Sequence, residues 1–269
     1  MTQARQYRIG RFLRGLALVV FAEMSGFAGG VLAQETIPAG TIIPVYFLHT
    51  IDSQKSKPGQ AVVAKVAQDV PLGEKQVIHR NTKVLGRIAQ IQTSAGRTTV
   101  VLQFDRIQMG HAQIPITTQV RALADAESVD EAQTPTDADD ARATSSFART
   151  TVQIGGDAVY RGGGPVQSRT GEIVGTPTGC IECGVLDRVP GAPGPQCAGA
   201  VADDTEPQAM WVFSADACGV YGFSNLQFQN GSTISRDGQF LLSANRPIKL
   251  PSGTALLLTV AGAQAGAEK

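Results

Sequence analysis

The sequence predicts an all-β protein: a small β-barrel completed by the C-terminal strand, with a Gly/Pro/Cys-rich β insertion. Short apolar and β-branched runs alternate with turn residues from 41 to 120, and no 3.6-residue period competes with them. A turn phrase at Pro38–Thr41 precedes an apolar run and returns near the end of the chain as Pro251–Thr254. A degraded copy lies at His79–Thr82, where Asn81 stands in place of glycine.

The turn phrase should shape the sheet rather than perform chemistry. We expect its proline to preset φ for the first corner of a type I turn, and glycine two residues later to take the left-handed conformation. Asparagine is the next most tolerant residue at such a position. A related turn at 57–60 places proline and glycine at the two corners of a type II turn. The expected turn positions are Pro38, Gly40, Pro58, Gly59, Pro251 and Gly253.

Residues 34–121 are expected to form the first part of the barrel, and 237–261 its closing strands, before a tail at 262–269. The predicted strands of the first part are 42–48, 61–66, 84–91, 98–107 and 113–120, with a bulge or bend at Gly86. If the two main copies of the phrase begin equivalent strands, the strand at 255–260 pairs with the first half. That pairing would remove both exposed edges of the sheet.

Residues 122–148 combine many acidic side chains with alanine, serine and threonine. A segment with so few large apolar residues cannot offset the entropy of ordering, so we predict an acidic, disordered linker. Calcium binding is the functional alternative. The segment lacks the glycine and the distal glutamate of an EF-hand loop, which argues against it.

Residues 149–236 are expected to be an inserted, disulfide-containing β subdomain. Met210–Phe213 and Val220–Phe223 look like its core strands, and 226–234 looks like a hairpin turning at Asn230-Gly231. The glycines at 162–164 suggest a phosphate loop, but no lysine and no helix follow them, which favours a simple turn.

Residues 1–33 have the order of a secretory signal peptide: four arginines, a short apolar run, then small residues up to Ala33. The apolar run is far shorter than the roughly 20 residues that span a bilayer, although an uncleaved anchor is the alternative. We therefore expect a periplasmic or secreted protein that begins at Gln34, without a transmembrane segment after cleavage. Lys and Arg number 23, as do Asp and Glu, so charge does not indicate nucleic acid as a partner.

Several of these phrases resemble the C-terminal β-barrel domain of TrbI-type conjugal-transfer proteins, the barrel scaffold subunits of type IV secretion channels. The resemblance covers roughly 37–121 and 237–260. It is carried by 37–45, 56–59, 77–86, 104–107 and 248–254. It implies a barrel fold and a place in the cell envelope.

The chain also departs from that family. Members carry an inner-membrane helix and a proline-rich stalk before the barrel, where this sequence shows a signal peptide. Their inserted pair of apolar helices is replaced here by the Cys/Gly-rich β insertion, which puts a role in secretion in doubt.

The four cysteines are Cys180, Cys183, Cys197 and Cys218. Two structural disulfides suit an exported chain. We favour Cys180–Cys183 and Cys197–Cys218 among three possible pairings. A zinc site would need a second CxxC pair, and a thioredoxin-like dithiol would need a helix after Cys183.

No catalytic constellation stands out, so no enzyme activity, cofactor or metal is predicted. The histidines, His49, His79 and His111, lie at strand ends and turns, and Ser224 lacks the second glycine of a nucleophile elbow. Asp105 and Asp216 are the closest to candidate acidic groups, and both read as turn or strand-end residues. Trp211, Tyr221 and Phe223 suggest either core packing or a sugar-stacking face.

The leading hypothesis is an exported, non-enzymatic β-barrel protein of the cell envelope, acting as a scaffold or interaction module. Its partners would be other envelope proteins or further copies of itself. A secreted ligand- or glycan-binding module that uses the insertion is the second hypothesis, and an unrecognised hydrolase is the third.

Overall fold

A computed structural model describes residues 36–72, 76–134, 149–155, 158–161, 165–168, 171, 173–177, 184–186, 208–214, 217–228 and 238–261. These residues are mostly β-strand, and their one α-helix, α1 (Ala126–Gln133), is too short to cross a membrane. The predicted all-β class is confirmed. The predicted signal peptide at 1–33 and the tail at 262–269 lie outside the described residues.

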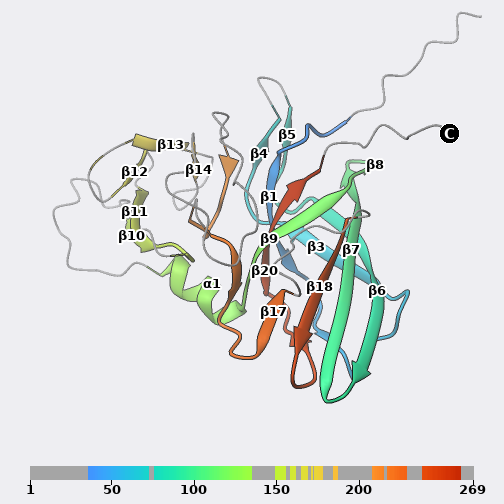
Figure 1. Ribbon diagram of the computed structural model, residues 1–269. Helices are drawn as coiled ribbons and strands as arrows, with labels where there is room; N and C mark the ends of the chain where they lie inside the picture. The colour runs from blue at the N-terminus through green and yellow to red at the C-terminus, as the bar shows by residue number, and fades with distance from the viewer. Residues whose placement is uncertain are drawn as a thin grey trace, which may run out of the picture. The chain divides into compact units, whose positions relative to one another are not determined.

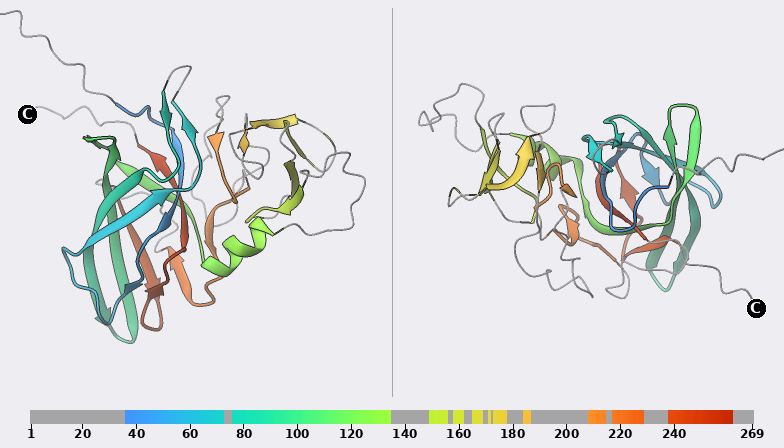
Figure 2. Two further views of the ribbon diagram at one scale, coloured as in Figure 1. Left: turned by 180° about the vertical axis from the view of Figure 1, so that it is seen from behind. Right: turned by 90° about the horizontal axis from the view of Figure 1, so that it is seen from above.

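Ten described strands form one large sheet that curves into a nearly closed barrel (Figures 1 and 2). Its path runs β16-β9-β20-β1-β3-β6-β7-β18-β17, with β8 also paired to β7. The bounds are β1 Ile42–Phe47, β3 Ala61–Val66, β6 Lys83–Ser94, β7 Arg97–Met109, β8 Ala112–Pro115, β9 Thr118–Ala124, β16 Gly219–Tyr221, β17 Leu226–Phe228, β18 Gln239–Ala244 and β20 Ala255–Val260. Two short pairs accompany it: β2 (Ile51–Asp52) with β19 (Lys249–Leu250), and β4 (Val70–Pro71) with β5 (Val77–Ile78).

The C-terminal strand β20 lies between β1 and β9 and is antiparallel to both. The prediction that this strand completes the barrel is therefore confirmed. The barrel is not fully closed by pairing of the described strands. Its opening is narrowed where the chain leaves β8 and meets one edge of β7. There the Ile116 amide donates to the Asp105 carbonyl at 2.9 Å, and the Thr118 hydroxyl donates to the Phe104 carbonyl at 3.2 Å.

Four turns hold the strand ends of this barrel in the same way, and we call each a turn clamp. Each is closed by an amide three residues after the accepting carbonyl, at 38–41, 57–60, 79–82 and 251–254. The third residue has a positive φ: 84° at Gly40, 83° at Gly59, 70° at Asn81 and 87° at Gly253. A positive φ there is the mark of a type II turn.

Each turn clamp grips a neighbouring strand with two backbone hydrogen bonds. The third residue donates to that strand: Gly40 to Val260, Gly59 to Ile88, Asn81 to Val66 and Gly253 to Phe47, at 2.8, 2.8, 2.8 and 2.9 Å. The same strand residues donate back, at 2.9 Å each, to the carbonyls of Thr41, Gln60, Thr82 and Thr254. The type I geometry expected for the phrase was wrong, because Pro38 and Pro251 supply the accepting carbonyl instead of occupying the first corner.

The barrel core is apolar and contains three phenylalanines in a row. The ring of Phe104 stacks on Phe47 at a centroid distance of 6.2 Å and on Phe240 at 6.1 Å. Gly86 lies beside this row at a shift in the β6–β7 register, which confirms the expected bulge. A Cβ at Gly86 would collide with the Gln103 carbonyl and the Phe104 ring, so only glycine fits there.

Three neighbouring strands, β1, β20 and β9, are buried on both faces. In β20, Leu256 and Leu258 point into the barrel core, whereas Ala255 and Leu257 join a second apolar cluster on the outside. This arrangement explains the nearly continuous apolar sequence of β20, since a strand covered on both sides has no polar face. The outer cluster includes Val129 and Ala132 of α1 together with Met210, Val212 and Phe213.

The expectation of a disordered linker at 122–148 was wrong for its first part. Residues up to Ala124 complete β9, and α1 follows directly. The helix forms because the Asp125 carboxylate caps it, accepting the Ser128 amide at 2.8 Å, and because Val129 and Ala132 bury one face against the barrel. Residues 135–148 lie outside the described residues.

The insertion also departs from its predicted bounds of 149–236. A separate six-stranded antiparallel sheet, counted over the described residues, is formed by β10 (Arg149–Val152), β11 (Ala158–Arg161), β12 (Val166–Ser168), β13 (Ile173–Pro177), β14 (Gly184–Leu186) and β15 (Gln208–Ala209). The strands β16 and β17 belong to the barrel sheet instead, because β16 pairs with β9 and β17 with β18.

Two local expectations in the insertion need correction. Met210, Val212 and Phe213 are buried, but the stretch is a turn region rather than a strand, and Phe213 makes an isolated bridge to Ile154. The strand at Leu226–Phe228 exists, but its described partner is β18 rather than the far arm of a local hairpin. The predicted hairpin turn and the glycines at 162–164 lie outside the described residues.

Candidate functional site

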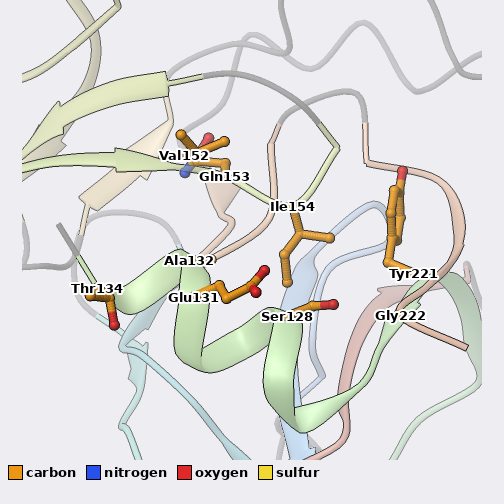
Figure 3. A pocket seen from close by; sticks show the side chains of 9 residues that line it. All are labelled: Ser128, Glu131, Ala132, Thr134, Val152, Gln153, Ile154, Tyr221 and Gly222. Atoms are coloured by element: carbon orange, nitrogen blue, oxygen red, sulfur yellow. The ribbon is translucent and has the colours of Figure 1, made fainter. Parts of the chain in front are cut away.

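A pocket of about 560 Å³ lies between α1, the chain that continues from β10, and the end of β16 (Figure 3). Three segments that are distant in sequence therefore supply its walls. The lining residues are Ser128, Glu131, Ala132, Thr134, Val152, Gln153, Ile154, Tyr221 and Gly222.

The helical wall follows from the way α1 sits on the barrel. Because residues three apart share a face, Val129 and Ala132 turn toward the apolar cluster, and Ser128 and Glu131 are left to face the pocket. The helix ends at Gln133 and is capped by Thr134, whose amide and hydroxyl both donate to the Asp130 carbonyl, at 3.0 and 2.9 Å.

The opposite wall is formed by Val152, Gln153 and Ile154. Val152 is 44% exposed, whereas Gln153 is 3% exposed and its side-chain amide donates to the Trp211 carbonyl at 3.5 Å. Ile154 is fixed by two backbone bonds of 2.8 Å, one to the Val212 carbonyl and one from the Ser214 amide. The wall is thus anchored at its inner end and presents an apolar side chain at its outer end.

Tyr221 and Gly222 form the third wall. The Tyr221 hydroxyl accepts from the Cys218 amide at 2.9 Å and donates to the Cys218 carbonyl at 3.0 Å, which holds the ring in place. Gly222 has a φ of 75°, and a Cβ there would collide with the Asp125 carboxylate. Only glycine leaves room for the carboxylate that caps α1.

The lining is suited to noncovalent recognition. Val152, Ile154, Ala132 and the Tyr221 ring offer apolar contact, while Glu131 offers one exposed carboxylate and Ser128 a hydroxyl. The hydroxyl of Tyr221 is already occupied by Cys218, so the face of its ring is what remains for a ligand. Mixed linings of this kind, with few polar groups, are typical of ligand sites.

The predicted turn residues lie at the strand ends of the barrel and not in the pocket. The histidines are separated: His49 and His111 are exposed, and His79 lies 3.6 Å from Asp69 with three quarters of its side chain exposed. Asp105 contacts the neighbouring Arg106 at 2.9 Å. Within the part of the chain that the structure describes, no group of three metal-ligating side chains comes together.

The suggested aromatic face is not formed. Trp211 lies 6.2 Å from Tyr46 between ring centroids, Phe223 packs against the barrel core, and Tyr221 packs against the outer cluster and lines the pocket. Of the predicted disulfide residues, Cys218 is buried beside Tyr221. The other three lie outside the described residues, so the pairing stays a prediction.

Sequence reasoning missed the pocket itself. Its walls come from residues near 130, 153 and 221, and no local motif links them. The one available signal was Asp125 followed by Glu127 in a first turn and by Val129 and Ala132 three residues apart, a short amphipathic helix start. The acidic composition of the surrounding segment concealed it.

No protein-family model matches the chain, and no curated protein matches it. Among solved structures, it has a likeness to ComB10 of the Com type IV secretion system of Helicobacter pylori. The two share 25% sequence identity, and the match covers 31% of this chain and 44% of the ComB10 chain. The chain thus matches less than half of ComB10. The TM-score is 0.25, a value that supports no inference about fold or function.

Proposed function

We propose that this chain is an exported, non-enzymatic β-barrel protein of the cell envelope that serves as a scaffold or interaction module. The observation that carries the proposal is that the residues of the family resemblance are largely the residues of the turn clamps. Most phrases that resemble the TrbI-type barrel, at 37–45, 56–59, 77–86 and 248–254, contain or overlap the turn clamps that hold the strand ends. The resemblance therefore lies in the turns that hold the barrel strands together.

The export part of the proposal is supported by the arginine-rich, apolar and then small-residue order of residues 1–33. A periplasmic or secreted location follows from that order. The barrel would then work outside the cytoplasm, where other envelope proteins or further copies of this chain are its partners.

The proposed role as an interaction module is supported by the outer apolar face of the barrel. Three of its strands carry an outer apolar face that holds α1 and the turn at Met210–Phe213 in place. This support positions the pocket walls, whose lining suits binding. A rigid barrel that displays a binding element is the arrangement expected of an interaction module.

Export is tested by producing the full chain in a Gram-negative host and measuring the intact mass in each cell fraction. We expect the periplasm or the medium to contain protein that begins at Gln34. A matched variant with Leu18→Asp and Val20→Asp, which breaks the apolar run, should remain unprocessed in the cytoplasm. Wild-type protein that retains residues 1–33 in the cytoplasm would contradict the proposal.

The scaffold role is tested by two experiments. One is analytical ultracentrifugation of the purified mature protein, and the other is cross-linking of the protein in its own cells. We expect assemblies larger than a monomer, formed with itself or with proteins of the envelope. A protein that stays monomeric in both experiments would instead support the second candidate, a secreted ligand-binding module, which the pocket between α1 and β10 favours.

A further inference from the structure

Cationic side chains gather on the outer wall of the barrel. Along β3, β6 and β7, residues of the barrel core alternate with side chains that point outward. The strands β6 and β7 lie on the side of the barrel away from α1 (Figures 1 and 2). We call the outward cations of this wall the basic face, and they are Lys65, Lys83, Arg87 and Arg106.

The basic face is concealed in the totals of the chain, where 23 cationic residues balance 23 acidic ones. One cationic residue lies in β3, two in β6 and two in β7, whereas Asp105 is the one acidic residue of these three described strands. The acidic residues of α1 lie elsewhere on the barrel, against β9 and β20. Opposite charges are therefore segregated, and one face attracts anions although the net charge is zero.

The charges of the basic face are unbalanced within the chain. Lys65 and Lys83 are direct partners in the β3–β6 pair, with their Cβ atoms about 5 Å apart, and like charges in such a pair destabilise a sheet. No carboxylate of the described residues lies within 4.0 Å of the side-chain nitrogens of Lys65, Lys83 or Arg87. Asp105 offsets only its neighbour Arg106, at 2.9 Å. An anionic surface from outside the chain would relieve this repulsion.

The cations are close enough to act together. Lys83 and Arg87 are four residues apart on β6, and Arg106 lies between them on the next strand, opposite Leu85. Sheet geometry therefore places each cation about 5–8 Å from the next at the backbone. These spacings do not exceed the Debye length of about 8 Å at physiological ionic strength, so their fields add.

The chemistry of the face favours a lipid surface over a protein partner. Specific protein interfaces are centred on buried aromatic or apolar anchors. Among the described residues, the large apolar side chains that are exposed are Val152 and Ile173, and they belong to β10 and β13. Anionic headgroups need no such anchor, because they attract lysine and arginine through the electrostatic field alone.

We propose that the basic face binds the surface of a membrane that contains anionic phospholipids. Its four cations contact lipid phosphates, while their aliphatic stems lie along the barrel wall. Because α1 is on another side of the barrel, the pocket faces away from the lipid and stays open to a ligand (Figure 2). This inference rests on the proposed location in the cell envelope and names the surface at which the barrel works there.

The test measures how much purified mature protein sediments with lipid vesicles. One set of vesicles is phosphatidylcholine, and the other is an equal mixture of phosphatidylcholine and phosphatidylglycerol. We expect binding to the mixed vesicles only, and we expect added salt to weaken it, since the attraction is between exposed charges. Equal binding to the two sets, or binding to neither, would overturn the proposal.

Neutral variants locate the contact on the barrel. Lys83→Gln and Arg87→Gln should each weaken binding to the mixed vesicles by about fivefold, the effect of one basic residue at an anionic surface. The matched control is Lys249→Gln, which removes an exposed charge on β19, outside the basic face. It should change binding by less than about twofold, because a charge far from the lipid is screened. Equal losses at all three positions would contradict the assignment.

A second pair of variants separates the position of the charge from the net charge. Lys83→Gln combined with Glu127→Gln restores the net charge of the chain but not the basic face, so its binding should stay as weak as that of Lys83→Gln alone. Full recovery would overturn the proposal. Without vesicles, Lys83→Gln should raise the urea midpoint of unfolding, because it removes the repulsion with Lys65. A lowered midpoint would show that Lys83 is balanced within the chain and would contradict the argument.

Two further measurements identify other occupants. Duplex DNA that binds as tightly as the mixed vesicles at the same salt concentration would identify a nucleic acid. Self-association without lipid that Lys83→Gln abolishes would identify a second copy of the chain. Either result overturns the proposal. Because these measurements use purified protein, an export failure leaves them unaffected, and a failure to bind vesicles leaves the proposed location standing.

Discussion

Pro44 and Leu257 face each other at the centre of the β1–β20 pair and hold the same position in two copies of one phrase. Each is the third residue after the threonine that ends its turn clamp. The clamp of each copy grips the far end of the other strand, Gly40 on Val260 and Gly253 on Phe47. The two copies are therefore related by a local two-fold arrangement, and the two ends of the barrel sequence hold each other.

Pro44 is compatible with this central place because the pairing of β1 with β3 ends beside it. Pro44 has no amide to donate, and its carbonyl accepts from Ala67 at 2.8 Å, just past the end of β3. The missing donor thus falls where the β1–β3 ladder ends, which is where proline is tolerated in a sheet.

The turn clamps predict a measurable cost at Gly59. Its Cβ direction is open, so Gly59→Ala introduces no collision and tests the positive φ alone. We expect a loss of about 1–2 kcal/mol in the free energy of unfolding, measured by urea denaturation. Gly59→Asn should lose less, because Asn81 already fills the same position in another clamp. Equal losses for the two variants would show that φ is not the cause.

Close packing at the β6–β7 bulge predicts a second effect. Gly86→Ala adds a methyl group where the Gln103 carbonyl and the Phe104 ring already lie. We expect a loss of about 1–3 kcal/mol or more, from overpacking that cannot be relieved without moving the strand. The exposed neighbour Gln90 provides the control, and Gln90→Ala should change stability by less than about 0.5 kcal/mol. A Gly86→Ala protein as stable as the control would mean that the strands are further apart than described.

The N-cap of α1 predicts a third effect on stability. Asp125→Ala removes the acceptor for the Ser128 amide and should cost about 1 kcal/mol, while Asp125→Asn keeps an acceptor and should cost little. Gly222→Ala should resemble Asp125→Ala in loosening α1, because its Cβ displaces the capping carboxylate. Exchange of the α1 amides, measured by mass spectrometry, distinguishes loosening of the helix from global unfolding. Unchanged exchange in Asp125→Ala would refute the cap's role.

The extent of successful prediction differs between barrel and pocket for a physical reason. The barrel is encoded locally, because each turn is determined by three or four consecutive residues and similar residues recur at several places in the chain. The strand β20 was recognisable since Thr254 is followed by an unbroken apolar run. The pocket depends on α1, which is capped by Asp125 and held in place because Val129 and Ala132 pack on the outer face of β9 and β20. The local sequence signals only a short helix start and does not contain that long-range contact.

The same reasoning explains the insertion's misplaced boundary. The strand β16 has only three residues, and it joins the barrel because Val220 lies parallel to Leu123, which is nearly a hundred residues earlier. Turn type was misjudged for a smaller reason. Proline in the phrase suggested a corner, whereas the positive φ of the glycine fixes the corners one residue later.

The cysteine pairing remains a prediction, and non-reducing peptide mapping checks it. We expect Cys197–Cys218 and Cys180–Cys183. The longer loop should stabilise the insertion by roughly 3 kcal/mol in the loop-entropy model. Replacing Cys197 and Cys218 by serine should loosen the insertion and leave the barrel folded. A linked Cys183–Cys197 or Cys180–Cys218 peptide would defeat the pairing, and stoichiometric zinc with four free thiols would defeat the disulfides.

The central claim is that the C-terminal strand closes the barrel in one register against the first strand. Tyr46 and Ala255 are partners in that register, so Tyr46→Cys combined with Ala255→Cys should form a disulfide between positions 46 and 255. The control combines Tyr46→Cys with Thr259→Cys, four residues out of register and about 13 Å further along the strand. Non-reducing peptide mapping of both proteins is the decisive measurement. The account predicts a 46–255 link and no 46–259 link, and a missing 46–255 link or equal linking in the control would contradict it.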